Sequence, residues 1–344
     1  MLCKIKQLKR QIRDYEKYMR LFEERYNVWP QARWFVMKHR GAYFPDYNNP
    51  ITLQEKAAWI ANKYYIKSPL AYFSGNKVTS KIYFKSKLGS DEHIVKTYGI
   101  YNTPNEIDWD KLPNSFAIKT TMGFQGKNVI LVKDKNKFKP KKHKKSLEAM
   151  THALQDGQPC PIIIEQLLDK FPETDTLQIT DYKIFCFNGE PAFVRVHSIN
   201  KNAKAFGSYD KNMTYYSLPD YKKLDIIHAS IVRHNNPDCP MPNCLHKMIE
   251  VAKKLSVGLP FARVDLYLAD EKIYVGEITI QGSVGYVFDP VKYDYIWGDM
   301  IKLPKEEEIE SLIEQDKKHI KQLIKTNYDI LHNLSNFEQI NAML

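Results

Sequence analysis

The sequence predicts an α+β protein with a mainly helical N-terminal region and a long C-terminal helix. Apolar residues recur at helical spacing near the start of the chain, over residues 4–25. Residues 115–132 and 161–200 are instead rich in β-branched and aromatic residues, with turn signals between them. From Pro304 to about Leu334, acidic residues come first and lysines follow, which is the order that complements a helix dipole.

The composition changes near residue 110, where segments rich in β-branched and aromatic residues begin, and we place a boundary there. The 344 residues of the chain suffice for two or three lobes. We expect a helical region over 1–110, a core over 111–303 and a C-terminal helix over 304–344. Within the N-terminal region, Thr52 and Glu55 have the spacing of a capping box, so a helix should begin there. A further helix is expected over 76–88.

Composition and charge narrow the range of partners. Lysine and arginine total 51 against 40 acidic residues, a formal net charge of +11 that favours a nucleotide, phosphorylated sugar, acidic glycan, nucleic acid or anionic lipid. The five cysteines are an odd number in a large chain, so we expect a reducing cytoplasm rather than a disulfide framework. The charged start is not expected to be a signal peptide, and no stretch approaches the roughly 18 apolar residues of a membrane span.

Two basic segments each have two interpretations. The helix over 4–25 either packs its apolar stripe on the protein itself, the commoner case, or lies on an anionic membrane. A second segment carries eight lysines, at positions 133, 135, 137, 139, 141, 142, 144 and 145. It is either a solvated loop or a docking strip for a polyanion. A helix should follow it, and another should cover 243–257 and end near Gly258.

A glycine-bearing loop lies between two lysines in residues 117–132. Lys119 alternates with Ile118 on the first strand and so points away from the apolar face. The loop is not a Walker A motif, because Gly123 and Gly126 are only three residues apart and a strand follows Lys127. It is either a lid over nucleotide phosphates, with Lys119 reaching them, or an exposed hairpin with surface lysines.

A second hairpin, over 261–280, carries two acids. With a three-residue turn, Asp265 lies opposite Glu277 and Arg263 opposite Thr279, whereas a two-residue turn would put the acids on opposite faces. Two adjacent carboxylates repel each other unless a cation lies between them, and oxygen ligands with phosphate suit Mg²⁺. The alternative is an ion pair of Asp265 with Arg263 or with a distant lysine.

These segments together resemble the TupA-like branch of the ATP-grasp ligases, which is linked to teichuronopeptide and surface-polysaccharide synthesis. The resemblance runs over about residues 48–300, through "NPITLQEKAAW", "LPNSFAIKTTMGFQGKNVIL", "PIIIEQLL", "DYKIFCFNGEPAFVRV" and "FARVDLYLADEKIYVGEIT". It implies an ATP-grasp fold in which two α+β subdomains clasp ATP, a lid over about 111–165 and a catalytic subdomain over about 166–303. It differs in Thr279, where many ATP-grasp enzymes have asparagine.

The resemblance also implies roles for individual residues. ATP would contact a cofactor-binding set: Lys119, Gly123, Gly126, Lys127, Glu165, Gln166 and Leu168. The acids Asp265 and Glu277 would hold Mg²⁺. Lys183 and Arg195 would face the transferred phosphoryl group, and Arg263 would hold the carboxylate substrate or orient Asp265.

The implied activity is a carboxylate–amine ligase that forms an amide through an acylphosphate. The carboxylate would belong to a uronic-acid-bearing capsular or surface polysaccharide or its precursor, and the amine to an amino acid or amino compound. The enzyme would be cytoplasmic, associated peripherally with membrane-bound glycan machinery at the inner face of the membrane. Two alternatives are a sugar kinase with the same ATP site and a non-catalytic nucleic-acid or membrane-surface binder, although no nucleic-acid-binding motif is present.

Overall fold

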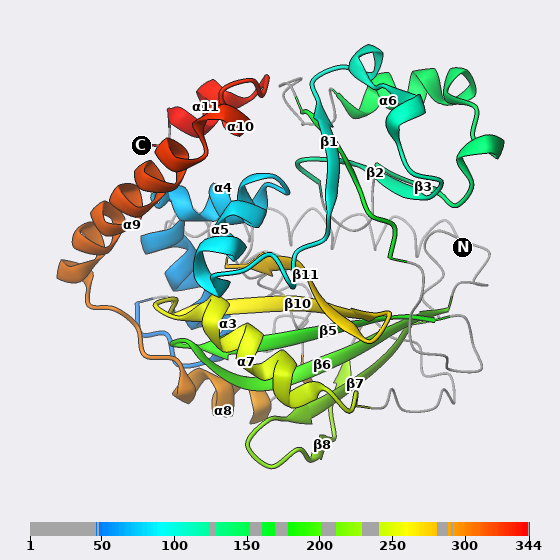
Figure 1. Cartoon of the computed structure of the whole chain (residues 1–344). Helices are drawn as coiled ribbons and strands as arrows, with labels where there is room; N and C mark the ends of the chain where they lie inside the picture. The colour runs from blue at the N-terminus through cyan, green and yellow to red at the C-terminus, as the bar shows by residue number, and fades with distance from the viewer. Residues whose placement is uncertain are drawn as a thin grey trace, which may run out of the picture.

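Two antiparallel sheets face each other in a computed structural model of the chain, with helices along one side (Figure 1). The structure describes residues 46, 48–123, 128–151, 160–168, 178–200, 211–228, 241–280, 288–289, 292–342 and 344. The helix expected over 4–25 lies outside them.

The smaller sheet, called here the lid sheet, has the strand order β1-β4-β2-β3. Its strands are β1 (Thr97–Tyr101), β4 (Ile162–Glu165), β2 (Phe116–Thr120) and β3 (Val129–Val132). One face packs on α6 (Lys144–Met150), where Leu147 and Met150 join Ile162 and Ile164 in one apolar cluster. Because side chains alternate along a strand, Lys119 and Glu165 lie on the other face. The expected boundary near residue 110 falls between β1 and β2.

The larger sheet has the strand order β11-β10-β5-β6-β7-β8. Its strands are β11 (Lys272–Thr279), β10 (Phe261–Ala269), β5 (Gln178–Phe187), β6 (Glu190–Asn200), β7 (Lys211–Ser217) and β8 (Lys223–Leu224). β5 and β6 are joined at Asn188 and Gly189, which both have positive φ, as a two-residue Asn-Gly hairpin turn requires. Helix α7 (Leu245–Ser256) packs on β5, β6 and β10, and Gly258 follows its end with positive φ.

Among the described residues, three helices precede the lid sheet: α3 (Leu53–Ile60), α4 (Pro69–Gly75) and α5 (Thr79–Leu88), with a π-helical turn (Ala61–Tyr65) after the first. The predicted capping box is confirmed, because Thr52 Oγ1 accepts from Glu55 N and the Glu55 carboxylate accepts from Thr52 N. Asn76 Oδ1 accepts from Val78 N at 2.9 Å in the turn that leads into α5.

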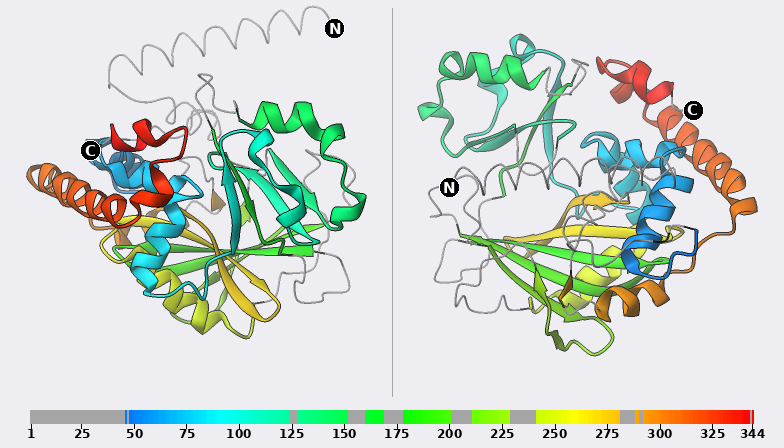
Figure 2. Two further views of the ribbon diagram at one scale, coloured as in Figure 1. Left: turned by 45° about the horizontal axis from the view of Figure 1, so that its top comes forward. Right: turned by 180° about the vertical axis from the view of Figure 1, so that it is seen from behind.

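The C-terminal helix α9 (Glu306–Thr326) lies along α4, on the same side of the molecule as α5 (Figure 2). It ends earlier than expected, and two short helices follow, α10 (Tyr328–Leu331) and α11 (Phe337–Asn341). Helix α8 (Lys292–Met300) packs on α3, and Trp297 stacks on Phe193 of β6 at 3.7 Å between ring centroids. The short pair β9 (Ile227–His228) and β12 (Phe288–Asp289) completes the described strands.

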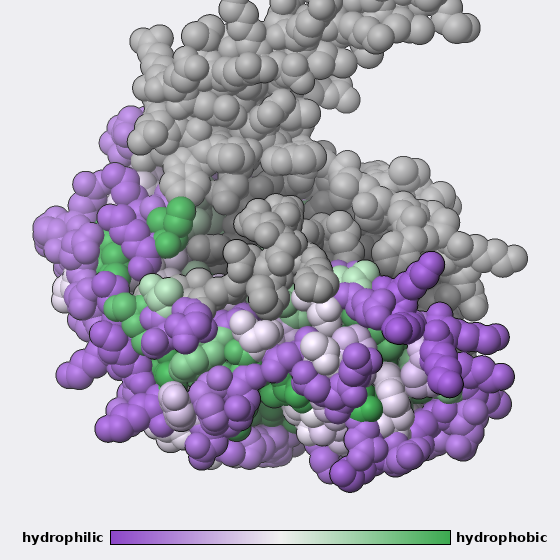
Figure 3. All heavy atoms as spheres, turned by 90° about the horizontal axis from the view of Figure 1, so that it is seen from above, coloured by the Kyte–Doolittle hydropathy of each residue, from purple (hydrophilic) through white to green (hydrophobic). Residues whose placement is uncertain are grey.

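The lysine-rich segment forms short 3-10 turns (Lys135–Lys137 and Pro140–His143) before α6. Lys135 is half-buried and donates to the Leu112 carbonyl at 2.7 Å, whereas the other seven lysines are exposed. Figure 3 shows a described surface that is mostly hydrophilic around its rim, with hydrophobic residues in small groups. None of the described helices combines the length and the apolar character that crossing a membrane requires.

Candidate nucleotide and metal site

The two predicted metal ligands lie opposite each other on neighbouring strands. β10 and β11 pair antiparallel, with Asp265 across from Glu277 and Arg263 across from Thr279, as predicted. Cross-strand partners in a sheet share a face. The two carboxylates therefore point to the same side of the larger sheet.

The turn that gives this register differs from the expected one. It has two residues, Asp270 and Glu271, both with positive φ, rather than three. The register then shifts by one residue, because a β-bulge leaves Gly276 without a partner on β10. A two-residue turn alone would have turned Glu277 to the opposite face, and the bulge returns it to the face of Asp265. The prediction of the pairing is confirmed and the prediction of the turn is wrong.

Four charged groups form a continuous ion-pair network on this face. Arg263 Nε donates to Asp265 Oδ1 at 2.6 Å, and one terminal nitrogen of the same guanidinium donates to Asp265 Oδ2 at 2.8 Å and to Glu277 Oε1 at 2.6 Å. Lys183 Nζ, from β5, also donates to Asp265 Oδ2. Burial opposes the charge on Asp265, but Arg263 and Lys183 outweigh it and hold its pKa below the usual range. Two of the three cations predicted for this site, Arg263 and Lys183, therefore contact the same acid.

A third acid, Asp181, joins the network, and the sequence reasoning did not identify it. Its Oδ2 lies 2.5 Å from Lys183 Nζ, and its side chain is buried. Burial raises the Asp181 pKa to about 6, against the opposing effect of Lys183. Burial also opposes the charge on Lys183, but Asp265 and Asp181 together raise the lysine's pKa. The signal was available, because Asp181 is two residues from Lys183 on one strand and so shares its face.

Arg195 and Thr279 lie beside the network. Arg195 pairs across strands with Lys183 and so shares its face, and its guanidinium lies 5.9 Å from the Phe185 ring centroid. Thr279 Oγ1 donates to Glu277 Oε1 at 3.2 Å. Thr279 therefore orients one of the acids in this structure.

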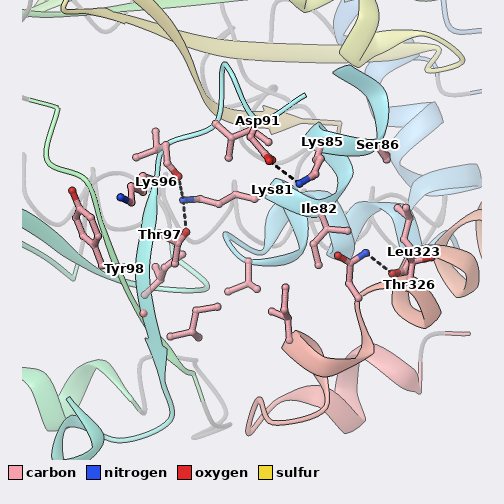
Figure 4. A pocket seen from close by; sticks show the side chains of 18 residues that line it. Lys81, Ile82, Lys85, Ser86, Asp91, Lys96, Thr97, Tyr98, Leu323 and Thr326 are labelled. Carbon is pink, nitrogen blue, oxygen red and sulfur yellow. Dashed lines mark hydrogen bonds and ion pairs between the residues drawn. The ribbon is translucent and has the colours of Figure 1, made fainter. Parts of the chain in front are cut away.

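The lid sheet carries a second charged group on its open face. Lys119 Nζ donates to Glu165 Oε1, and Lys81 Nζ donates to Glu165 Oε2 at 2.9 Å. Lys81 extends from α5 to β1 and also donates to Val95 O at 2.7 Å and Thr97 Oγ1 at 2.9 Å (Figure 4). Burial opposes the charge on Glu165, but the two lysines outweigh it and lower its pKa.

A cavity of about 830 Å³ adjoins this group on the β1 side, between α5, β1 and the α9–α10 junction. Lys81 forms part of its wall and so separates the cavity from Glu165. The sequence reasoning gave Lys81 no role, because its importance depends on how α5 lies against β1.

Lys77 connects the two charged groups. Its Nζ donates to the Gly123 carbonyl at 3.2 Å, at the start of the glycine-bearing loop, and its backbone N donates to Thr121 O at 2.8 Å. Burial and Lys119 lower its pKa, while Glu277 on the larger sheet and Glu165 on the lid sheet oppose that change. Lys77 thus interacts electrostatically with charged groups of both sheets. Two other loop residues of the predicted set, Gly126 and Lys127, lie outside the described residues.

The segment after β4 runs from the lid sheet to the second hairpin. Gln166 N donates to Lys96 O at 2.8 Å, and Leu168 packs against the cluster formed by Val95, Ala269 and Tyr274. The predicted adenine contacts Gln166 and Leu168 therefore lie where the lid strand meets the β10–β11 hairpin.

The donor set suits a magnesium ion. One guanidinium nitrogen lies within 2.8 Å of both Asp265 and Glu277, so the two carboxylates already converge on a single cationic atom. Mg²⁺ is commonly held by one or two carboxylates together with substrate phosphates. Among the described residues there is no cluster of three or more metal-binding side chains, so phosphate oxygens would complete the shell.

Two α+β units whose facing sheets carry lysines and paired acids define an ATP-grasp fold. The chain belongs to the TupA-like ATP-grasp family, whose model matches residues 56–302, and the resemblance is thereby confirmed. No curated protein matches the chain.

Similarity to solved structures is distant. The chain is similar to D-alanine–D-alanine ligase from Helicobacter pylori, with 18% identity over 67% of this chain and 62% of that one, and a TM-score of 0.40. For D-alanine–D-alanine ligase from Bacillus anthracis in complex with ATP, the identity is 11% over 73% of this chain and 66% of that one, with a TM-score of 0.37. For an L-amino acid ligase from Bacillus licheniformis, the identity is 12% over 67% of this chain and 51% of that one, with a TM-score of 0.36. The chain thus spans less than two thirds of the Helicobacter pylori structure.

Proposed function

We propose that this protein is an ATP-dependent carboxylate–amine ligase that forms an amide through an acylphosphate. The observation that carries the proposal is the convergence of Asp265 and Glu277 on one Arg263 nitrogen, with Lys183 bound to Asp265 on the same sheet face. A polyphosphate requires several cations and a metal-binding acid pair within one site. The chain supplies both on two facing sheets.

Each charged side chain has a defined task in this proposal. Lys119 and Lys77 neutralise phosphates from the lid side, and Lys183 and Arg195 do so from the larger sheet. Asp265 and Glu277 would hold Mg²⁺, which supplies charge neutralisation at phosphate oxygens. Gln166 and Leu168 hold the base, because they lie where the lid strand passes to the catalytic hairpin.

The reaction has two steps. A substrate carboxylate oxygen attacks the γ-phosphorus of ATP, and the bond to the ADP oxygen breaks to give an acylphosphate. The amine then attacks the acyl carbon, loses a proton, and expels phosphate to leave an amide. Arg263 is the residue that positions the carboxylate, because its guanidinium already binds carboxylates in a fork and would be released when Asp265 and Glu277 bind the metal.

We propose a uronic-acid-bearing surface polysaccharide or its precursor as the carboxylate and an amino acid or amine as the nucleophile. The formal charge of +11 supports anionic substrates in general. The specific sugar follows from the family's link to surface polysaccharides. Such a role would place the enzyme in the cytoplasm beside membrane-bound glycan assembly.

A screen of ADP release tests this function. The protein is incubated with Mg²⁺ and ATP, with and without uronic acids and with and without amines. We expect ADP release to require both substrates, whereas release with an alcohol alone would identify a sugar kinase. Salt-sensitive RNA binding without ADP release would identify a nucleic-acid binder.

Variants of the acid pair test the site. Asp265→Asn and Glu277→Gln are expected to lower turnover by roughly 100-fold or more, because each removes a metal-binding oxygen donor. Glu271→Gln, an exposed change in the turn of the same hairpin, is the control and should retain wild-type activity. A fully active Asp265→Asn/Glu277→Gln double variant would end the metal proposal.

A further inference from the structure

We infer that Asp181 is a positioning residue that keeps Lys183 at the phosphate site when Asp265 is engaged by the metal. The inference rests on the proposed function. It follows from the way in which Lys183 is shared between two acids.

Lys183 Nζ is bound by Asp265 on one side and by Asp181 on the other. The Asp181 contact is 2.5 Å, and both partners lie on neighbouring positions of the same sheet face, one on β5 and one on β10. All three side chains are close to fully buried, with 12%, 10% and 2% of the Lys183, Asp181 and Asp265 side chains exposed. A buried ammonium group at this position therefore depends on a counter-charge from the protein.

The two acids are expected to have different contacts once a nucleotide and its metal bind. Asp265 is a proposed metal ligand, so its Oδ2 would no longer be free for Lys183. Asp181 lies opposite Tyr267 on β10, two positions along from Asp265, whereas Glu277 lies directly opposite Asp265. Asp181 is thus the partner that Lys183 retains.

The Asp181 carboxylate has the capacity for this task. Its Oδ1 is buried and has no hydrogen-bond partner among the described residues, while its Oδ2 holds Lys183. When Lys183 leaves Asp265, both oxygens of Asp181 are available to the ammonium group. Lys183 then stays charged and close to the phosphates instead of turning towards solvent.

The same arrangement occurs in mirror image on the lid sheet. There the acid Glu165 is shared between Lys119, which the proposed function assigns to phosphate, and Lys81, which stays. In each group, a central side chain (Lys183 or Glu165) has two partners. One partner would bind the nucleotide or its metal, and the other would stay paired with the central side chain. This parallel supports a structural rule for the site rather than a chance contact.

The test uses Asp181→Asn, which keeps the shape and removes the charge. A matched control is Asp220→Asn, because Asp220 and Lys222 form the same Asp-Tyr-Lys sequence with a 3.3 Å ion pair, but on an exposed turn. We expect Asp181→Asn to lower kcat by about 10- to 100-fold with little change in the KM for ATP, because a misplaced cation acts mainly in the transition state. Asp220→Asn should leave both constants unchanged.

A second readout needs no turnover. Acylation of Lys183 by an N-hydroxysuccinimide ester, followed by peptide mass spectrometry in the presence of Mg²⁺–ADP, reports how firmly the ammonium group is held. We expect faster labelling of Lys183 in Asp181→Asn and unchanged labelling of Lys56, a half-buried lysine away from the site. Asp181→Ser serves as a second variant if the asparagine variant unfolds.

The outcomes separate the two proposals. If the wild type turns over and Asp181→Asn has the same kcat and the same rate of Lys183 labelling as the wild type, the positioning role is overturned and the ligase proposal stands. If Asp181→Asn also needs a higher Mg²⁺ concentration for activity, the positioning role is overturned and Asp181 is instead a third metal ligand. If the wild type shows no turnover, the ligase proposal fails, and the labelling of Lys183 still decides the role of Asp181.

Discussion

Glu165→Gln should destabilise the lid sheet, because Glu165 is the one acid that neutralises both Lys119 and Lys81 in the described part of the site. Only 5% of its side chain is exposed, against 17% for Lys81 and 30% for Lys119. Gln keeps the shape but leaves two ammonium groups without their carboxylate. Removing one partner of a buried pair costs roughly 3–5 kcal/mol. Since Lys119 is partly exposed and can turn to water, we expect a loss of about 2–4 kcal/mol in the free energy of unfolding.

The assay is urea unfolding together with hydrogen exchange of the β4 peptide, which reports on the lid sheet directly. Glu310→Gln is a matched control, because Glu310 forms a 3.3 Å pair with Lys67 in which both side chains are mostly exposed. That variant should change the unfolding free energy by less than about 0.5 kcal/mol. Lys81→Met in the Glu165→Gln background should recover part of the loss, because it removes one buried charge that has lost its partner.

The pH dependence gives the same prediction an independent check. Because the Glu165 pKa is lowered in the folded state from 4.5, its contribution is fully present above that pH and is lost as the pH falls through the folded value. The stability difference between wild type and Glu165→Gln should therefore shrink on acidification below about pH 4.5. A difference that stays constant with pH, or one below 0.5 kcal/mol at neutral pH, would refute the assignment of Glu165 as the counter-ion of both lysines.

Two further predictions concern the packing of α8 on α3. Burial raises the pKa of Asp294 from 3.8 to about 7, so wild type should lose up to roughly 4 kcal/mol of stability as the pH rises from 4 to 7. The Asp294→Asn variant should not lose stability over this pH range. If urea unfolding shows the same pH dependence for wild type and variant, the assignment to Asp294 is wrong. Gly298→Ala should destabilise by more than about 2 kcal/mol, because the new Cβ would lie 2.1 Å from the Ile51 carbonyl oxygen. Gly75→Ala, with nothing within 4 Å of its Cβ, should be neutral or stabilising, and a thermal melt in which both variants behave alike would refute the argument.

The sequence predicts well those features of the fold that depend on neighbouring residues, such as helix caps and turns. The capping box at Thr52 and Glu55, the turn at Asn188 and the end of α7 near Gly258 are each decided by residues within one or two turns of chain. The end of α9 was misplaced because no glycine or proline marks it. The chain continues through Asn327 into α10, so the apolar pattern runs on while the helix axis changes.

Lys119 and Asp265 were predicted from strand alternation, because the pattern of buried and open faces on their strands fixes the side to which they point. Lys183 was predicted from the family resemblance alone. Lys77 and Lys81 were not predicted, because α5 reaches the site through its packing on the rest of the molecule, which no local pattern encodes. Lys77 lies in the turn before α5 and Lys81 lies within the helix, and only the structure shows that both reach the site.

The register of the β10–β11 hairpin shows how a correct pairing can follow from an incorrect turn. Ile273, Val275 and Ile278 of β11 and Ile280 just after it join the main apolar core, whereas Tyr274 joins a separate small cluster, so the alternation breaks by one residue at Gly276. A glycine at a break of parity within a strand indicates a bulge. Two local signals are thus both satisfied: the two-residue turn fixes the half near its loop, and the bulge restores the alternation for the half that carries Glu277. The position of the acid pair therefore depends on the apolar residues on both sides of Gly276, which bury their side chains on the core face and so force Glu277 to the face of Asp265.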